Sequence, residues 1–371
     1  MGAGSSHTCG LTLEGVVYCW GANDAGQLGI GASDNNPHPT PARTTGGHNF
    51  VALSVGDSHS CALTASLTAY CWGEGQGGRL GDGADVRRAA PVVVQGGLAF
   101  ASLSAGGDHT CGISTGGTAY CWGVNNRGQL GDSSTTDRFV PTRVATGGLV
   151  FLSIAAGAFH SCGLAAAGSA YCWGDNSEGQ LGDTSPAGLC LGTCSSGPLP
   201  GSLAPVPVST ALVFVALTAG TPHTCGVAMG EGRKGAAYCW GDGDYGQLGN
   251  GSQSGSLVPV PVVGSLTFTS LSARQLHTCG IAAGNTAYCW GWNPDGQLGI
   301  GSTSWNGAPG STSPARVSGE LSFSSISAGG DHSCALTPAG AAYCWGAGSF
   351  GQLGNGDTVL VTVPVPVASV R

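Results

Sequence analysis

The sequence is poor in charge and has almost no lysine. Charged residues make up 9% of the 371-residue chain, lysine occurs once, at Lys234, and the formal net charge is −8. Because binding to a nucleic-acid backbone needs a stripe of basic side chains, this composition argues against a nucleic-acid partner. The adjacent pair Arg87 and Arg88 is too small to change that expectation.

Long apolar runs and catalytic motifs are also lacking. No run of about 18 apolar residues occurs, so we expect no membrane insertion. The first four residues have no signal-peptide character, and we expect that a signal has been removed or that the sequence was excised from a longer protein. No hydrolase elbow, phosphate loop or zinc-protease motif is present. We therefore expect neither catalysis nor a bound cofactor or metal.

A repeated motif organises the whole chain. Tyr-Cys-Trp-Gly, followed in most copies by Gly-Gln-Leu-Gly, occurs seven times, starting at Tyr18, Tyr70, Tyr120, Tyr171, Tyr238, Tyr288 and Tyr343. A His-x-Cys triplet precedes each copy, starting at His7, His59, His109, His160, His223, His277 and His332. A period of roughly 50 residues is typical of a closed or stacked array. Residues 1–371 are therefore predicted to form one domain of seven repeats, with an insertion at 184–203 between repeats four and five.

Each repeat contains four short β-runs. In the third repeat these are residues 100–106, 109–113, 119–122 and 141–144, and the proline of the last run suits an edge strand. Short β-runs with regular turn signals predict an all-β protein. Four strands per unit predict a seven-bladed β-propeller with four-stranded blades. The Tyr and Trp beside each second cysteine should point to opposite faces and fill the space between blades.

The two ends of the chain are nearly continuous in repeat phase. Residues 1–4 correspond to the end of the first strand of a repeat, residues 103–106. Residues 363–367 correspond to the outer strand at 258–262. We therefore expect the ring to be closed by strands from both termini, which together complete one blade.

Fourteen of the sixteen cysteines fall into seven pairs, one pair in each repeat. Directly opposite residues of an antiparallel hairpin are about 4.5 Å apart at a non-hydrogen-bonded pair, within reach of a disulfide. The hairpin register predicts seven disulfides, namely Cys9–Cys19, Cys61–Cys71, Cys111–Cys121, Cys162–Cys172, Cys225–Cys239, Cys279–Cys289 and Cys334–Cys344. The fifth pair is 14 residues apart because its turn is longer. Cys190 and Cys194 are expected to close a small local loop.

The disulfides predict an oxidising compartment. We expect the protein to be extracellular or on the cell surface, with the periplasm as the alternative.

At these residues the chain resembles the regulator of chromosome condensation repeat family. The pattern is Gly-x-x-His-(Ser/Thr)-Cys…(Val/Ala)-Tyr-Cys-Trp-Gly-x-x-x-x-Gly-Gln-Leu-Gly, and it spans essentially all of the chain. The resemblance implies a seven-bladed propeller. Members of this family include a nuclear guanine-nucleotide exchange factor, a secreted bacterial inhibitor of β-lactamase, and adhesive or binding modules. The paired cysteines and the lack of a basic tail depart from the nuclear type, and the disulfides resemble those of exported bacterial members of the family.

The repeat histidines are candidate metal or catalytic residues. Each neighbouring cysteine already has a hairpin partner, and seven identical catalytic sites are improbable. We expect the histidines to satisfy buried backbone groups instead.

One loop position varies while its surroundings do not. The residue before the second glycine of Trp-Gly-x-x-x-x-Gly is Ala25, Gly77, Arg127, Glu178, Tyr245, Asp295 and Phe350 in successive copies. A packing position would repeat, so we expect these residues to face solvent at one end of the ring, around the central channel. Arg87, Arg88, Arg138, Phe139 and Trp305 occupy the variable loops that follow Leu-Gly, and Trp292 lies in the same loop as Asp295. Exposed arginines and aromatics on loops are typical binding anchors, although unconstrained surface variation is the alternative.

The leading hypothesis is an exported, disulfide-stapled propeller that binds another protein through one loop-bearing face, as a scaffold or inhibitor, without catalysis. A carbohydrate-binding or surface-adhesion module is the first alternative, because Trp292 and Trp305 are suited to stack on sugar rings of a glycan. A structural subunit of an extracellular assembly is the second. An enzyme, including a nucleotide exchange factor, is disfavoured.

The disulfide framework is testable by intact mass after alkylation, with and without prior reduction. We expect that no cysteine is alkylated before reduction. Free alkylation of most cysteines would contradict the hairpin staples and would make the His-x-Cys triplets candidate metal sites.

Overall fold

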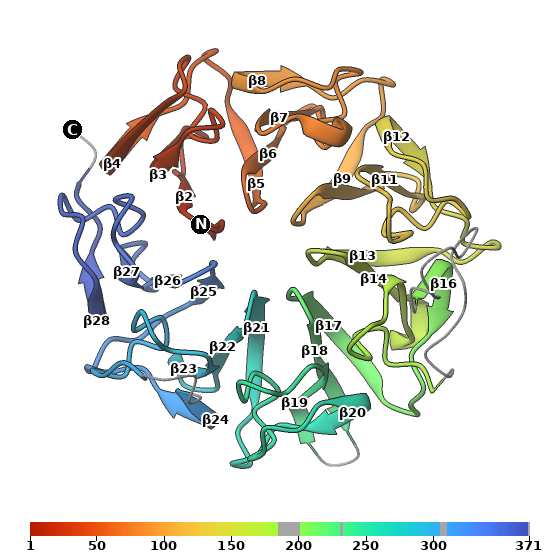
Figure 1. Cartoon of the computed structure of the whole chain (residues 1–371), viewed down its shortest axis with the longest axis vertical. Coiled ribbons are helices and arrows are strands. Elements are labelled where there is room, and N and C mark those ends of the chain that lie inside the picture. Colours follow the sequence, from red (N-terminus) through yellow and green to blue (C-terminus); the bar gives the residue numbers. More distant parts are fainter. Residues whose placement is uncertain (185–200, 231–232, 305–309, 370–371) are drawn as a thin grey trace.

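The computed structural model describes residues 1–184, 201–230, 233–304 and 310–369. Seven four-stranded antiparallel sheets are arranged as the blades of a ring (Figure 1). In the described part of the chain, the helical elements are two 3-10 turns, η1 (Gln76–Gly78) and η2 (Ala166–Gly168). The structure confirms the predicted all-β, seven-bladed propeller.

Each blade uses four consecutive strands, and the first strand of each is the innermost in Figure 1. Blades one to three are β1 (Gly2–Ala3), β2 (His7–Leu11), β3 (Val17–Asn23), β4 (Asp34–Arg43); β5 (Phe50–Val55), β6 (His59–Thr64), β7 (Ala69–Gly73), β8 (Arg88–Val93); and β9 (Phe100–Ala105), β10 (His109–Ser114), β11 (Ala119–Gly123), β12 (Arg138–Arg143). Blades four and five are β13 (Phe151–Ala156), β14 (His160–Ala165), β15 (Ala170–Asp175), β16 (Gly201–Pro207); and β17 (Val213–Ala219), β18 (His223–Gly230), β19 (Arg233–Gly241), β20 (Ser256–Pro261). Blades six and seven are β21 (Phe268–Arg274), β22 (His277–Ala282), β23 (Thr286–Gly291), β24 (Ser311–Arg316); and β25 (Ser325–Ala328), β26 (His332–Leu336), β27 (Ala342–Gly346), β28 (Val361–Pro366).

The ring is closed differently from the prediction. No sheet in the described part of the chain takes strands from both termini, so the expectation of a shared blade is wrong. Residues Gly2–Ala3 form the inner strand of the first blade alone, as a two-residue strand that pairs with β2. Closure is non-covalent: the Trp20 indole Nε1 and the Thr8 hydroxyl both donate to the Gln352 carbonyl of the last blade, at 2.9 Å each.

The predicted hairpin register is confirmed in every blade. Cys111 lies directly opposite Cys121, and the seven disulfides join Cα atoms 4.0–4.1 Å apart. In the fifth blade Cys225 still faces Cys239, because the additional residues lengthen the far end of the hairpin, where a register shift follows Ala228. The cysteines at 190 and 194 lie outside the described residues. Of the predicted insertion, Gly201–Leu203 belong to β16.

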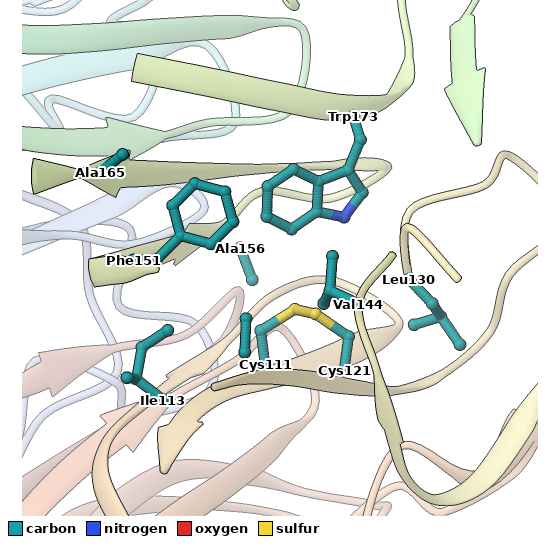
Figure 2. Close-up of a cluster of buried hydrophobic side chains, with 10 residues drawn as sticks. Cys111, Ile113, Cys121, Leu130, Val144, Phe151, Ala156, Ala165 and Trp173 are labelled. Carbon is teal, nitrogen blue, oxygen red and sulfur yellow. A yellow bond between two sulfur atoms is a disulfide. The ribbon is translucent and has the colours of Figure 1, made fainter. Parts of the chain in front are cut away.

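An apolar cluster fills each junction between blades. Figure 2 shows the junction of blades three and four, where the Cys111–Cys121 disulfide of one blade lies beside Phe151 and Trp173 of the next. The Trp173 side chain is fully buried, and its ring lies 5.8 Å from that of Phe151. Burying one such indole removes about 150–250 Å² from water, which is worth about 4–6 kcal/mol at 25 cal/mol per Å². Burial of the Trp that follows each second cysteine is therefore a large apolar contribution to each blade junction.

The glutamine of each Gly-Gln-Leu-Gly loop forms a hydrogen bond with this Trp. Its backbone carbonyl accepts the indole N–H of the next blade at 2.9–3.0 Å in six junctions, from Trp20, Trp72, Trp173, Trp240, Trp290 and Trp345. The second blade has Arg79 in place of this glutamine, and the facing Trp122 N–H has no partner in the described structure.

The seven repeat histidines form a ring of hydrogen bonds that passes through every blade. Each Nε2 contacts the hydroxyl of the Ser or Thr that follows the histidine of the next blade, at 2.7–3.0 Å, in the pairs His7–Ser60, His59–Thr110, His109–Ser161, His160–Thr224, His223–Thr278, His277–Ser333 and His332–Thr8. The expectation that they bind buried backbone groups is therefore wrong, because a hydroxyl is the partner. The preceding glycine makes room for the ring: a Cβ on Gly220 would lie 2.6 Å from Cε1 of His223.

The directions of the hydrogen bonds determine which nitrogen of each imidazole carries the proton. The same hydroxyls donate to the carbonyl of the Gln (or Arg79) loop at 2.8–3.4 Å. A hydroxyl has one proton, so it accepts the N–H of Nε2 and leaves Nδ1 unprotonated. Burial lowers the pKa of His7, His109, His160, His223, His277 and His332 to about 3, and burial followed by nearby positive groups lowers that of His59 well below its usual value.

The low pKa values of these histidines predict a marked loss of stability in acid. An unfolded histidine titrates near about 6.5, whereas the folded ones stay neutral to about pH 3. Between these values the unfolded chain binds more protons, so the histidines' contribution to the free energy of unfolding should be constant above about pH 6.5 and fall as the pH decreases toward 3. Chemical denaturation at a series of pH values measures this slope.

A His109→Gln variant separates the two effects of one ring member. Losing the buried hydrogen bond to Ser161 should cost about 1–3 kcal/mol at pH 7. Removing one titrating group should also make the acid slope shallower by about 1.4 kcal/mol per pH unit. A His48→Gln variant, outside the ring, is the control. An unchanged slope in His109→Gln would contradict the neutral state assigned to this histidine.

Candidate functional site

Two sets of loops share one end of the ring, which we call the loop face. They are the turns between the first and second strands of each blade and the loops between the third and fourth, which lie at the same end because the strands are antiparallel. Within the third blade the two are joined by a hydrogen bond of 2.9 Å from the Val124 N–H to the Asp108 carbonyl. In the part of the chain that the structure describes, both sets of connections therefore lie on one side of the scaffold.

The varied positions lie over the junctions between blades. The glycine that follows each one is close to the outer strand of the next blade: Gly246 has φ +80°, and a Cβ there would lie 2.8 Å from the Thr312 Cα. The prediction placed the varied residues around the central channel. The channel is instead lined by the inner strands and the first turns, for example Ala105, Ala156 and Arg274.

The varied residues are not equally exposed. Ala25 and Gly77 are buried, Arg127, Tyr245 and Asp295 are half-buried, and Glu178 and Phe350 are exposed. Small residues in the first two blades thus serve packing, and the side chains with access to solvent begin at the third blade.

All six arginines of the loop face are paired with carboxylates. The pairs, with N–O distances of 2.6–3.7 Å, are Arg79–Asp108, Arg87–Glu74, Arg88–Asp82, Arg127–Asp175, Arg138–Asp132 and Arg274–Asp57. Arg88 and Arg138 each lie at the start of an outer strand and bind a nearly buried carboxylate of their own blade. Four of the predicted anchors, Arg87, Arg88, Arg127 and Arg138, therefore contribute no unpaired positive charge.

The free charge of the loop face is negative. Among the acidic residues that the structure describes, only Glu14 and Glu320 lie in connections at the opposite end. An acidic arc without a paired cation follows the loops of blades four to seven, with Glu178, Asp242, Asp244, Asp295 and Asp331. Partial burial, then the carboxylates of Asp242, Asp175 and Asp244, raise the pKa of Glu178. Burial, then Asp295, raises that of Asp331. The arc would favour a positive partner group.

Aromatic side chains accompany the acidic arc. Tyr245 of the fifth blade contacts Trp292 of the sixth edge-on, with 4.5 Å between ring centroids. Phe350 of the seventh blade is 45% exposed, and Phe139 of the third is 38% exposed. The structure thus brings together two predicted residues, Tyr245 and Trp292, whereas Trp305 lies outside the described residues. Phe159, in the first turn of the fourth blade, is as exposed as Phe139, but the sequence analysis did not predict it.

One ion pair crosses the channel mouth. Arg274 of the sixth blade donates from Nη2 and Nε to Oδ1 of Asp57 in the second blade, at 2.7 and 3.0 Å, and from Nη1 to the Val55 carbonyl. The sequence analysis missed this contact. The sequence does contain an indication of it, because Arg274 replaces the glycine of Gly-x-x-His in this copy only.

In the part of the chain that the structure covers, no group of three His, Cys, Asp or Glu side chains is arranged to hold a metal ion. The same residues include no helix with the length and apolar character needed to span a membrane. What the loop face offers is a surface of acidic and aromatic groups on a rigid ring.

Comparison with known sequences identifies relatives of the whole chain. The ultraviolet-B receptor UVR8 of Arabidopsis thaliana is 31% identical over 370 residues, which cover 98% of this chain and 68% of UVR8. The E3 ubiquitin-protein ligase HERC2 of Homo sapiens is 28% identical over 97% of this chain, but the chain spans only 6% of that protein.

Solved structures show the same architecture. Prp20p of Saccharomyces cerevisiae, described with its binding properties to Gsp1p and histones, superposes with a TM-score of 0.82 at 21% identity, covering 97% of this chain and 87% of that one. The ectodomain of the receptor kinase CR4 of Physcomitrella patens gives a TM-score of 0.56 at 25% identity, covering 93% and 72%.

The profile described as "Regulator of chromosome condensation (RCC1) repeat" matches residues 14–63, 68–113, 116–164, 234–286, 284–336 and 339–371. Each match contains one of the Tyr-Cys-Trp-Gly motifs, so that six of the seven motifs are matched, and together the matches cover well over half of the chain. The chain belongs to the RCC1 repeat family.

Proposed function

We propose that this propeller is an exported, non-catalytic protein-binding module that contacts its partner through the loop face, as a scaffold or an inhibitor. The observation that carries the proposal is the composition of that face: its arginines are neutralised in ion pairs, so that acidic groups and exposed aromatics remain available. Short loops on a rigid scaffold commonly carry binding residues.

The negative charge of the loop face favours a partner with a basic surface. Complementary charge steers association and suppresses wrong partners, and the arc from Glu178 to Asp331 has no positive side chain of its own to satisfy it. Tyr245, Trp292 and Phe350 would supply the apolar contacts, because aromatic side chains are enriched among residues that dominate binding energy.

Export is supported by the disulfides. Seven hairpin disulfides among the described residues suit an oxidising compartment. The similarity to a receptor-kinase ectodomain points the same way. That the chain is of the bacterial exported type stays a prediction.

Variants of the loop face test the proposal. Tyr245→Ala and Phe350→Ala should each weaken partner capture about tenfold, because truncating a central aromatic anchor costs over 1 kcal/mol. Glu178→Gln combined with Asp244→Asn should weaken capture at low salt and reduce its salt dependence. The measurement is quantitative mass spectrometry of proteins retained from secreted material on the immobilised propeller.

Leu13→Ala is the matched control, because Leu13 is a fully exposed apolar side chain and lies at the opposite end of the ring. The variants should keep the wild-type melting temperature. If the loop-face variants retain the same proteins as the wild type, and Leu13→Ala loses them, the loop face is not the binding surface.

A further inference from the structure

A polar pocket of about 210 Å³ opens on the loop face, at the junction of the first and seventh blades. Its walls come from the end of β3, the start of β4 and the loop after β27, and its lining residues include Asn23, Asp24, Asp34, Asn35, Asn36 and Phe350. Pockets for drug-sized ligands measure about 300–1,000 Å³. This pocket is smaller, so it has room for a single ring or a single side chain.

One wall of the pocket is an extension of the outer strand of the first blade. β4 spans 10 residues, whereas the other outer strands of the described chain span 6 or 7. In the second blade the outer ladder begins where Gly73 pairs with Arg88, but in the first blade it continues to the pair of Asn23 with Asp34. The additional residues of β4 therefore stand higher on the loop face than the outer strands of the other blades.

Phe350 forms the opposite wall. The His38 N–H of β4 donates to the Phe350 carbonyl at 3.2 Å, and the Phe350 N–H donates to Oε1 of Gln352 at 2.9 Å. A Cβ on Gly351 would lie 2.5 Å from the Cα of Pro39, so this loop lies directly against β4. Phe350 is nevertheless 45% exposed. The two walls are thus held together by the backbone, and the aromatic ring is available to a ligand.

The Asp34 carboxylate is engaged by its own neighbours. It accepts hydrogen bonds from the Asn36 N–H at 2.9 Å and from Nδ2 of Asn23 at 3.2 Å, and Nε2 of His38 lies 3.1 Å from it. Asn23 is 1% exposed, and its Nδ2 also donates to the Ala32 carbonyl. Asp34 therefore makes the wall rigid and has few lone pairs left for a ligand.

The free polar groups of the pocket are one carboxylate oxygen and two amides. Nε2 of Gln27 donates to Oδ1 of Asp24 at 2.9 Å, which leaves Oδ2 without a hydrogen-bond partner among the described residues. The side chains of Asn35 and Asn36 are exposed and have no partner among those residues either. An amide both donates and accepts, whereas a carboxylate only accepts. The pocket therefore offers donors and acceptors together, beside an aromatic ring.

These groups match a sugar better than a cationic side chain. A sugar hydroxyl also both donates and accepts, so adjacent hydroxyls can bind an amide and a carboxylate at once. The C–H groups on one side of a pyranose are weakly positive, and the face of an aromatic ring is negative. A guanidinium or ammonium group only donates. It would find one free carboxylate oxygen in this pocket, whereas the acidic arc offers five carboxylates.

We propose that this pocket binds one pyranose ring of a glycan, with its apolar side on Phe350 and its hydroxyls on the free carboxylate and the two amides. This site adds carbohydrate binding to the protein contact proposed above and does not depend on that contact. It also places the sugar away from Trp292, whose ring packs against Tyr245.

Titration with methyl glycosides tests the proposal. The probes are the methyl β-pyranosides of glucose, galactose, mannose and N-acetylglucosamine, and the signals are the side-chain amides of Asn35 and Asn36 in a ¹⁵N–¹H correlation spectrum. At least one probe should shift both amides and saturate as a single site. The same probe should bind about tenfold more weakly to Phe350→Leu, which lacks the ring, and to Asn35→Ala combined with Asn36→Ala.

Two further variants complete the test. Phe350→Tyr restores an aromatic ring, and tyrosine already stands at the equivalent position 245, so it should recover the binding that Phe350→Leu loses. Asn49→Ala is the matched control for the amides, because Asn49 is exposed and lies between β4 and β5, at the opposite end of the ring. All variants should keep the wild-type melting temperature, since the changed side chains reach solvent.

Two arrays identify the source of the ring. One carries glycans of glycoproteins and the other carries polysaccharides, and at least one should retain the wild type but not the variant that lacks both amides. Retention on neither array, no amide shift with any methyl glycoside, or equal binding by Phe350→Leu would each overturn the proposal. So would saturation of the site by N-acetylarginine amide in place of the sugars. The protein contact is judged separately, by the capture that Tyr245→Ala should weaken.

Discussion

One shared hydroxyl at each blade junction is the contact on which the ring depends. It accepts a hydrogen bond from the histidine of the preceding blade and donates to the carbonyl of that blade's Gly-Gln-Leu-Gly loop, as Ser161 does for His109 and Gln129. The Trp173 indole binds the same carbonyl. Each junction therefore requires the histidine, the Ser or Thr and the Trp of the repeat. Because the seventh junction uses the same contacts between His332, Thr8 and Gln352, the ring closes without a covalent link or a shared sheet.

This arrangement leaves the surface of the loop face free to vary. The glutamine loop must keep its ends, since they position the carbonyl. The residue before its second glycine lies over the junction and differs between copies, from the buried Gly77 to the half-buried Tyr245 and the exposed Phe350. Charge is distributed unevenly as a result. Carboxylates gather on the loop face, whereas Arg43, Arg143 and Arg316 are exposed toward the other end of the outer strands. Such an asymmetry orients an approaching charged partner before contact.

The sequence predicted what the repeat specifies. The strand order, the number of blades and the register of Cys111 with Cys121 follow from spacing alone, because a hairpin of fixed turn length permits one register. The prediction failed where the answer depends on a neighbouring blade. The histidine's partner is a hydroxyl about 50 residues away, and no pattern within one repeat identifies it. The arginine anchors were misjudged for the same reason, since Arg127 is neutralised by Asp175 of the next blade. The shared blade was an inference from phase, and matching phase is also satisfied by a short strand at Gly2–Ala3.

The most direct test of the junction is the tautomer of its histidines, measured by ¹⁵N–¹H correlation of the imidazole nitrogens between pH 7 and 5. The account predicts seven neutral rings with the proton on Nε2 and no titration in this range, while the rings of His38 and His48, which lie outside the ring of hydrogen bonds, report the chain's other histidines in the same spectrum. Protonation of the seven near pH 6.5, or a proton on Nδ1, would contradict the hydroxyl-centred junction.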